Sequence, residues 1–248
     1  MLSKKIGKIV HLLIGAAFVL PSFAQEPVAG QCLIEPFAKV ELGTPVPGIL
    51  SDVMVERGDV VQKNTVVAKI DSRAQSATVA LAKSKAEFAK RTLQRNEELL
   101  KEDLLSNQEK DQMATESELA QLELEQALVT VELRSIRSPI DGVVVEKVRT
   151  RGEFVDEGAV LELAQINPLN VEVVVPVTYF GKVEAGMLAT VFPEAPIGGS
   201  YQAKVVVVDK VIDPASGTFR VRLQMPNKEM KIPSGLRCDI KFPFEDNG

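Results

Sequence analysis

The sequence is poor in the side chains that most often carry out chemistry or stack on ligands. It has no Trp, two Tyr and a single histidine, His11. So few Trp and Tyr rings disfavour a surface that binds sugars or bases by stacking. With a single histidine, the chain has almost none of the residue that most often serves as a general base and as a metal ligand. No phosphate-binding loop, nucleophile–base pair or pair of catalytic carboxylates is evident. The sequence therefore indicates a protein that is not an enzyme, with no cofactor and no metal site.

The first 24 residues have the features of a secretory signal. Three lysines precede an apolar run over residues 9–20, and small residues follow at Ser22 and Ala24. We expect cleavage after Ala24. The run is short for a membrane span, and an uncleaved N-terminal anchor is the alternative. Cleavage removes His11 and leaves 26 basic against 34 acidic residues, a net charge of −8. Such an acidic chain is a poor partner for nucleic acid.

Only two cysteines are present, Cys32 and Cys238, and they lie near opposite ends of the chain. In an oxidising compartment an even pair most simply forms a disulfide. This bond would tie the start of the exported chain to its last predicted strand. Two free buried thiols are the alternative.

Two segments, 48–70 and 142–164, repeat at a constant offset of 94 residues. Each consists of short β-prone runs separated by turns. Half-units this short cannot bury their apolar faces alone, so we predict that they pair into one small β-sandwich. The matched pairs are Gly48 and Gly142, Arg57 and Arg151, Gly58 and Gly152, Val61 and Val155, and Val66 and Val160, with Asp59 opposite Glu153 and Asn64 opposite Gly158.

The paired repeat resembles a biotinyl/lipoyl-like domain that is cut between its halves. In carrier versions of that fold, a modified lysine lies on the hairpin that joins the halves. Here residues 72–137 replace the hairpin. The resemblance therefore implies no carrier lysine and no swinging-arm chemistry.

Residues 72–137 are predicted to form two antiparallel helices joined by a turn near 103–106. Neither Gly nor Pro occurs from Asp59 to Ser138. Apolar residues follow a heptad spacing in two series, which is typical of a coiled coil. The first arm is basic on its flanks and the second is acidic. This opposite charge would pair the two arms, or pair neighbouring hairpins in an oligomer; a solvated surface is the alternative. The first series is Val79, Ala82, Ala86, Ala89, Leu93 and Leu100, with Asn96 polar, and the second is Leu119, Leu122, Val129, Leu133 and Ile136, with Gln126 polar.

The turn between the predicted helices combines a cap with a spacing motif. Ser106 and Glu109 form a capping box, a sufficient structural reason for Ser106. Arg95, Leu99 and Ser106 stand at i, i+4 and i+11. This spacing resembles the Arg–Leu–Ser tip motif of periplasmic adaptors that dock on TolC-like outer-membrane channels. The resemblance implies a polar contact from Arg95, an apolar contact from Leu99, and a cap that also bonds the partner from Ser106. An ordinary flank charge and a coiled-coil neighbour are the alternatives for Arg95 and Leu99.

The chain as a whole resembles the HlyD-like membrane fusion proteins, more specifically periplasmic adaptors of RND-type efflux systems. Residues 213–227, "DPASGTFRVRLQMPN", resemble the adaptor β-barrel signature, in which Val221 and Leu223 would point inward. The same barrel without the assigned partners is the alternative. The implied fold is mostly β with an inserted α-helical hairpin: signal peptide 1–24, an N-terminal segment 25–45 contributing to the barrel, a lipoyl-like β-sandwich at 46–71 and 138–166, the antiparallel coiled coil at 72–137, and an adaptor-type β-barrel at 167–248.

The resemblance also implies the role and the partners. A non-catalytic adaptor in the periplasm would link an inner-membrane RND-type transporter to a TolC-like outer-membrane channel. It would self-associate, as a hexamer or a trimer of dimers. An ABC-type exporter as partner is one alternative, and a periplasmic lipoyl-fold binding module outside transport is another. Little sequence follows the predicted barrel, so we expect the membrane-proximal domain of larger adaptors to be absent or vestigial.

Overall fold

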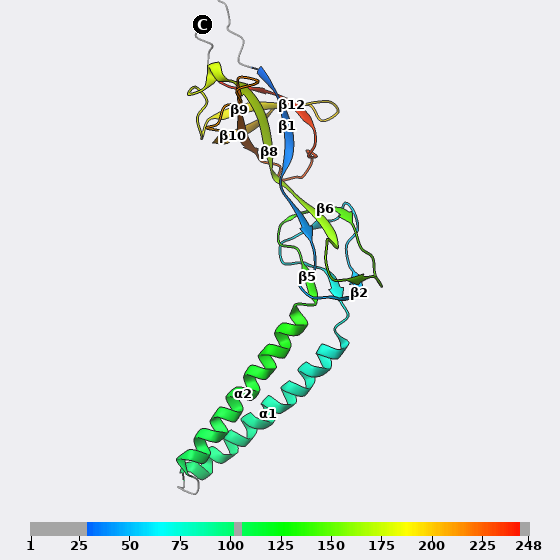
Figure 1. The fold of residues 1–248 in the computed structure, drawn as a ribbon, viewed down its shortest axis with the longest axis vertical. Coiled ribbons are helices and arrows are strands. Elements are labelled where there is room, and N and C mark those ends of the chain that lie inside the picture. Colours follow the sequence, from blue (N-terminus) through cyan, green and yellow to red (C-terminus); the bar gives the residue numbers. More distant parts are fainter. Residues whose placement is uncertain (1–28, 102–105, 244–248) are drawn as a thin grey trace, which may run out of the picture.

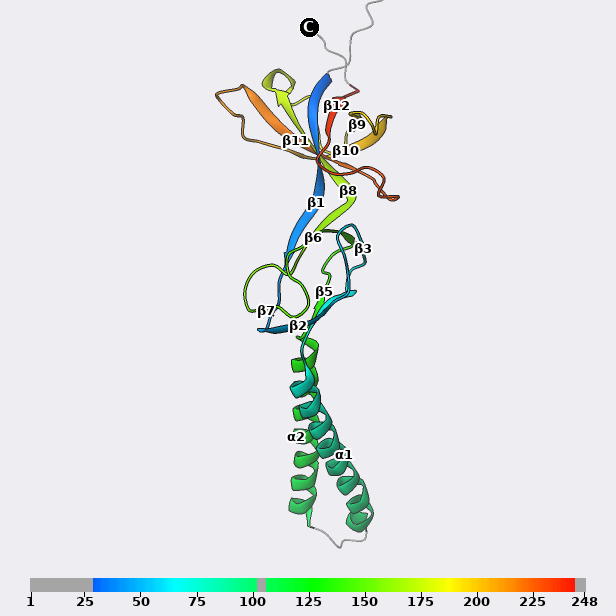
Figure 2. The same cartoon turned by 90° about the vertical axis from the view of Figure 1, so that its right-hand side faces the viewer.

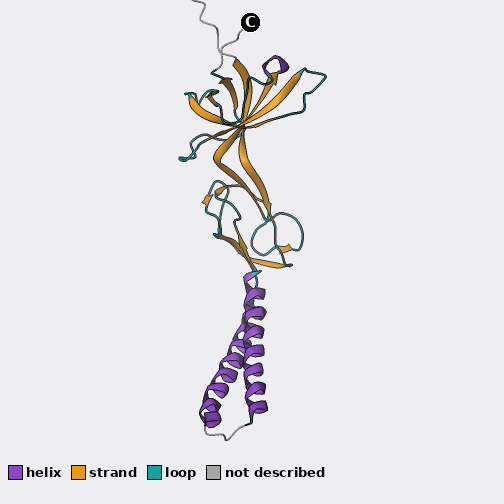
Figure 3. Cartoon of the chain, turned by 90° about the vertical axis from the view of Figure 1, so that its left-hand side faces the viewer, coloured by secondary structure: helices purple, strands orange, loops and turns teal. Residues whose placement is uncertain are grey.

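The computed structural model describes residues 29–101 and 106–243, which form three bodies in a row (Figure 1). A β-barrel lies at one end, a β-sandwich in the middle and a helical hairpin at the other end, and a view at 90° shows the same order (Figure 2). Within these described residues, helix is confined to the hairpin apart from one short helical turn (Figure 3). The predicted fold class is therefore confirmed. The predicted signal segment lies outside the described residues. In the part described, no helix is long and apolar enough to cross a membrane.

Two long antiparallel strands join the barrel to the sandwich. β1 (Ala29–Leu42) pairs with β8 (Leu161–Pro176), from Cys32 opposite Val173 to Leu42 opposite Leu161. The pairing shifts register between Pro36 and Ala38, where the chain passes from one body to the next. The connection is thus a two-stranded ribbon with backbone hydrogen bonds along most of its length.

This ribbon corrects two predicted boundaries. The sequence assigns residues 25–45 to the barrel, but the second half of β1 pairs with residues 161–165 and belongs to the sandwich. The predicted boundary between residues 166 and 167 falls inside β8. Both strands continue through the crossing, so no break in secondary structure marks the boundary between the two bodies.

The sandwich has the internal symmetry that the repeat predicts. One sheet has the order β5-β4-β2-β7, and the other continues from β8 through β6 to β3. Val61 lies opposite Gly142, and Val155, which is 94 residues after Val61, lies opposite Gly48. The short strand β3 of the first repeat therefore pairs with the second repeat, and the short strand β7 of the second repeat pairs with the first. The strands are β2 (Gly48–Val53), β3 (Val60–Val61), β4 (Val66–Ile70), β5 (Ser135–Arg137), β6 (Gly142–Lys147) and β7 (Phe154–Val155).

The turns repeat with the same offset. Gly58 and Gly152 have φ angles of 94° and 91°. Asn64 and Gly158 have φ angles of 69° and 87°, so this matched pair also shares left-handed backbone. Left-handed backbone favours glycine and asparagine over other residues. The matched residues of the repeat therefore share a backbone conformation as well as a chemical type.

The barrel is a closed ring of six strands. Their order is β1-β12-β9-β10-β11-β8, and the pairing of β1 with β8 closes the ring. Along β11 every second side chain is buried, and Val221 and Leu223 are fully enclosed, as predicted. A short helical turn, η1 (Val177–Tyr179), follows β8. The remaining strands are β9 (Leu188–Pro193), β10 (Tyr201–Val208), β11 (Thr218–Met225) and β12 (Arg237–Lys241).

A buried asparagine ties the barrel to the ribbon. The amide nitrogen of Asn227 donates to the carbonyl oxygens of Ile166 and Ile232, both at 2.9 Å. Its backbone N–H donates to Oδ1 of Asn167 at 3.0 Å. Asn227 ends the barrel signature, and the sequence offered no reason for it. The structure supplies one, because a buried amide is costly unless its polar groups are paired.

The hairpin consists of α1 (Arg73–Lys101) and α2 (Asn107–Glu132). The first predicted seam faces α2, since Ala82, Ala86 and Ala89 are buried. Small side chains on this face allow the two helices to approach closely. At 1.5 Å per residue α1 is about 43 Å long. The hairpin stops short of the predicted residue 137, because residues 135–137 form β5 and pair with β4.

The second predicted seam is wrong. The residues of α2 that face α1 are Ala120 and Ala127, with partly buried Leu124. Four predicted members, Leu119, Leu122, Val129 and Leu133, are 42–56% exposed, and the fifth, Ile136, is buried in the sandwich core. Two heptad series run along α2 on different faces, and the series richer in leucine is on the outside. Periodicity alone cannot decide which of two such faces packs inward.

Candidate functional site at the hairpin tip

Ser106 caps the second helix at the tip. It is the residue before α2 and has extended backbone, with φ −74° and ψ 155°. Its hydroxyl oxygen accepts from the backbone N–H of Glu109 at 3.3 Å, and Glu109 accepts in return from the backbone N–H of Ser106 at 2.9 Å. This is the predicted capping box, which pairs two amides that the helix itself cannot pair. The backbone N–H of Ser106, and after it the Ser106 hydroxyl at 2.8 Å, donate to the Glu109 carboxylate and so lower the pKa of this carboxyl.

Arg95 and Leu99 lie one turn apart on the last part of α1. Arg95 is exposed, and its neighbour Asn96 points across to α2, where its amide contacts the sulfur of Met113 at 2.9 Å. Because adjacent residues on a helix point in different directions, Arg95 is turned away from the contact between the helices. The side chain of Leu99 and residues 102–105 lie outside the described part. The structure thus places all three predicted tip residues at one end of the hairpin, remote from the barrel (Figure 1).

The two helices carry opposite charge. α1 has seven Lys and Arg against three Glu, whereas α2 has one Lys against seven Asp and Glu. Across the described part of the hairpin, a single ion pair joins the helices, between Lys85 and Glu123 at 2.7 Å. Both side chains are about half exposed, so this pair adds little to stability. Most of the charge on the hairpin therefore faces outward.

At the base of the hairpin, an arginine that the sequence did not single out connects it to the sandwich. Nη1 of Arg134 donates to the backbone carbonyl of Asp71 at 2.8 Å, and the backbone carbonyl of Arg134 accepts from Ile70. Asp71 also accepts from the Arg73 side chain and backbone, which lowers the pKa of its carboxyl to about 2. These contacts join the segment that enters the hairpin to the segment that leaves it, so they set the direction in which the tip points. No periodic signal marks Arg134, because its partner is 63 residues away.

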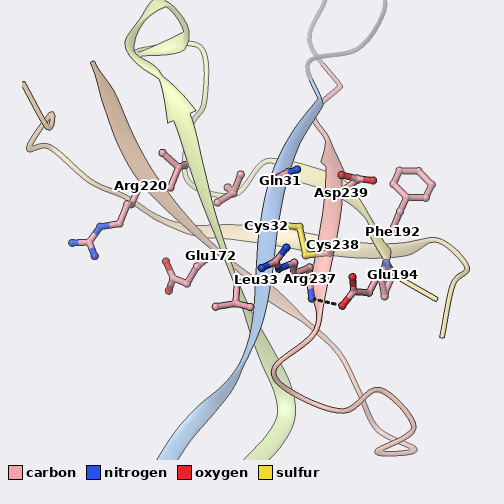
Figure 4. Close-up of a pocket in the computed structure, with 13 residues that line it drawn as sticks. Gln31, Cys32, Leu33, Glu172, Phe192, Glu194, Arg220, Arg237, Cys238 and Asp239 are labelled. Atoms are coloured by element: carbon pink, nitrogen blue, oxygen red, sulfur yellow. Dashed lines mark hydrogen bonds between the residues drawn. A yellow bond between two sulfur atoms is a disulfide. The ribbon is translucent and has the colours of Figure 1, made fainter. Parts of the chain in front are cut away.

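The barrel end contains the predicted disulfide. Cys32 on β1 lies directly opposite Cys238 on β12, and the two are bonded with their Cα atoms 4.8 Å apart. The bond lies beside a surface depression of about 800 Å³, which is lined by exposed Arg220 and Arg237 and by partly buried Glu172 (Figure 4). Side chains of both charges point outward there without converging on one point. Among the residues that the structure describes, no three His, Cys, Asp or Glu side chains gather as metal ligands would.

Comparison with known proteins assigns the family. The profile of the CzcB-like barrel-sandwich hybrid domain matches residues 39–165, more than half of the chain. The chain belongs to this family. The matched region begins in the second half of β1 and ends in β8, so it contains the sandwich and the whole hairpin. These proteins are membrane fusion adaptors and not enzymes, which confirms the family and the non-catalytic role predicted from the sequence.

This chain aligns with several efflux-pump proteins along much of its length. A toluene efflux pump periplasmic linker protein, TtgD of Pseudomonas putida, is 27% identical over 212 residues, which cover 79% of this chain and 56% of TtgD. An uncharacterized protein of Haemophilus influenzae is 25% identical over 220 residues, covering 87% of this chain and 57% of its own. The chain thus spans little more than half the length of these relatives.

Solved structures share the fold. A MacA–MexA chimera, which contains the α-hairpin of Pseudomonas aeruginosa MexA, superposes with a TM-score of 0.73 at 21% identity and covers 88% of this chain and 81% of its own. MacA of Actinobacillus actinomycetemcomitans superposes with a TM-score of 0.58 at 21% identity, covering 88% of this chain and 79% of its own. The order of barrel, sandwich and hairpin is therefore that of known adaptors.

Proposed function

We propose that this family member is a periplasmic adaptor that links an inner-membrane RND-type transporter to a TolC-like outer-membrane channel. Its hairpin tip, with Arg95, Leu99 and Ser106, would dock on the channel, and its barrel end would face the transporter. Self-association into a ring would enclose the path of the substrate. The observation that carries the proposal is the tip itself: a capped turn with an exposed Arg95 stands at the far end of a rod from the barrel.

The shape of the molecule supports this role. A rod about 43 Å long ends in the tip, and the ribbon of β1 and β8 joins the sandwich to the barrel through paired strands. Such a molecule is suited to hold two partners apart at a set distance. The relatives that carry a role in their names are linkers of efflux pumps, which is the same class of role. Selection of the substrate would then belong to the transporter.

Site-specific photo-crosslinking in cells tests the docking tip. A photoreactive residue at position 99 or 106 should capture an outer-membrane channel protein. The same residue at Gln121, which is exposed midway along α2, should not. Val211, which is 81% exposed on the barrel, serves as a probe of the other end. Capture from Val211 together with no channel from either tip position would contradict the tip assignment.

A pair of variants separates docking from capping at Ser106. Ser106→Asp keeps a good helix cap but replaces the hydroxyl with a charge, whereas Ser106→Ala removes both. If Ser106 contacts the channel, both variants should lose channel capture from position 99. If Ser106 only caps the helix, Ser106→Asp should capture as well as the parent chain does.

The transporter class is tested from the barrel. Crosslinks from Val211 should yield an RND-type transporter, which draws on protons. Recovery of an ABC-type exporter in its place would change the partner and leave the adaptor role intact. Loss of substrate tolerance in a deletion strain, restored by the full chain, would exclude a binding module outside transport.

A further inference from the structure

The hairpin presents two apolar surfaces that no other described part of the chain covers. On α2, Leu119, Leu122, Val129 and Leu133 form an outer stripe, spaced by three, seven and four residues and 42–56% exposed. On α1, Leu81 and Phe88 form an outer pair one heptad apart, 72% and 61% exposed. Exposed apolar residues that keep a heptad spacing are unusual on a solvated helix and typical of a helix-packing face.

The two surfaces lie at the same height along the rod. The contacts of Lys85 with Glu123 and of Asn96 with Met113 show which residues of the two helices are level. In that register Phe88 is level with the segment between Leu119 and Leu122, and Leu81 is level with the segment just before Val129. Two hairpins that stand side by side in the same orientation therefore bring these surfaces together without any shift along the rod.

Charge selects which helices meet. Seven acidic residues on α2 would repel the α2 of another copy, but the excess of basic residues on α1 would attract it. Glu118 and Glu125 flank Leu122 at helical spacing, and Arg91 flanks Phe88. In the described part of the chain, none of these three takes part in a salt bridge. They are available to pair across an interface.

We propose that the outer stripe of α2 packs against the outer pair of α1 in a second copy of this chain. Because the two surfaces differ, the contact is heterologous. Two copies joined in this way still have one uncovered outer stripe and one uncovered outer pair. Repetition therefore extends the assembly until it closes. The proposal rests on the self-association included in the proposed function, and it names the surface and the pairing. An outer-membrane channel is the less suitable occupant. The stripe begins 13 residues after Ser106, about 20 Å from the tip, and runs toward the sandwich.

Crosslinking between two variants, each with one added cysteine, tests the pairing. Full-length Phe88→Cys and Leu122→Cys chains carry different tags, are mixed, and are treated with a short bis-maleimide, which leaves the native disulfide intact. We expect mixed-tag dimers at about tenfold the yield of a control mixture of Lys90→Cys and Gln121→Cys. Both control positions line a groove between the helices, and neither is a member of the outer stripe or the outer pair. Dimers that join two Leu122→Cys chains preferentially would overturn the heterologous pairing. A yield equal to the control would overturn the surface.

Sedimentation provides a second measurement that does not need a crosslink. Leu122→Ser should weaken self-association about tenfold or more, because it removes apolar area from the contact. Leu128→Ser is the matched control, since Leu128 is similarly exposed, at 51%, but lies outside the stripe. Equal weakening by both variants, or a chain that stays monomeric at every concentration, would overturn the proposal. A chain that self-associates in this way but never captures a channel would contradict the docking tip alone.

Discussion

Gly48 and Gly142 begin equivalent strands 94 residues apart, and at both positions a side chain would overlap the strand packed against it. At Gly48 an added Cβ would overlap the side chain of Ile70. At Gly142 it would overlap the carbonyl oxygen of Ala164 and lie 2.9 Å from the carbonyl carbon. The two halves of the repeat therefore keep glycine here because the neighbouring strand of the same sheet, β4 at Gly48 and β8 at Gly142, approaches closely.

Substitution of these glycines should destabilise the sandwich to different degrees. Gly142→Ala should cost at least about 2 kcal/mol, because backbone of β8 cannot move aside. Gly48→Ala should cost less, because a side chain can adjust more easily than a strand. Gly152→Ala is the control: its cost of about 1 kcal/mol should come from the positive φ alone, since the space around it is open. Urea unfolding of the three variants measures the order, and a Gly142→Ala variant no less stable than Gly152→Ala would refute it.

The disulfide should stabilise the barrel. The bond between Cys32 and Cys238 joins residues 206 apart in sequence and fastens β12, which pairs with β1 over only five residues. Replacement of both cysteines by serine should lower the stability of the barrel by about 3–5 kcal/mol, because the unfolded chain regains the freedom that the bond removes. Thermal unfolding with and without reductant measures the effect. Reductant should bring the parent chain close to the double variant and leave the variant unchanged.

Asn227 should be more sensitive than the neighbouring buried asparagine. Asn227→Ala leaves two buried carbonyl oxygens and the N–H of Ile232 without their partner, which should cost about 2–4 kcal/mol. Asn170→Ala is the comparison, because Asn170 makes one long bond of 3.4 Å to the carbonyl of Phe37, and its Oδ1 is unpaired. Denaturant midpoints of the two variants measure the difference. A larger loss at Asn170 would show that the network at Asn227 is not what holds the barrel to the ribbon.

The start of α2 should loosen in acid. The pKa of Glu109 is lowered in the folded hairpin, so its carboxylate stabilises the cap above the ordinary pKa of a glutamate, about 4.3. This contribution disappears as the pH falls through the lower folded value, when the carboxyl takes up a proton and no longer accepts the Ser106 bonds as an anion. Amide exchange at residues 107–110 should therefore become faster relative to the middle of α2. Glu109→Gln should remove this pH dependence, and an unchanged profile in that variant would assign it to another group.

How much could be read from the sequence varies with the range of the interactions. The 94-residue repeat predicted the sandwich and the turns between its strands, because turns and strand alternation depend on neighbouring residues. The Gly58 and Gly152 turns and the Ser106 cap are local in this sense, and the structure shows them where the residues placed them. The Arg134 bond to Asp71 and the Asn227 network are not local, and no pattern announced them.

The sequence alone determined that one β half-unit precedes the helical hairpin and another follows it. Composition, turn residues and heptad spacing can be read directly from the order of the residues. Only the folded molecule decided which face of α2 meets α1, since two apolar series of the same period compete and the small side chains of Ala120 and Ala127 allow the closer approach. It also decided that β1 and β8 pass through both β bodies. Both outcomes depend on contacts between distant segments, and the free energy of such packing has no signature in local sequence.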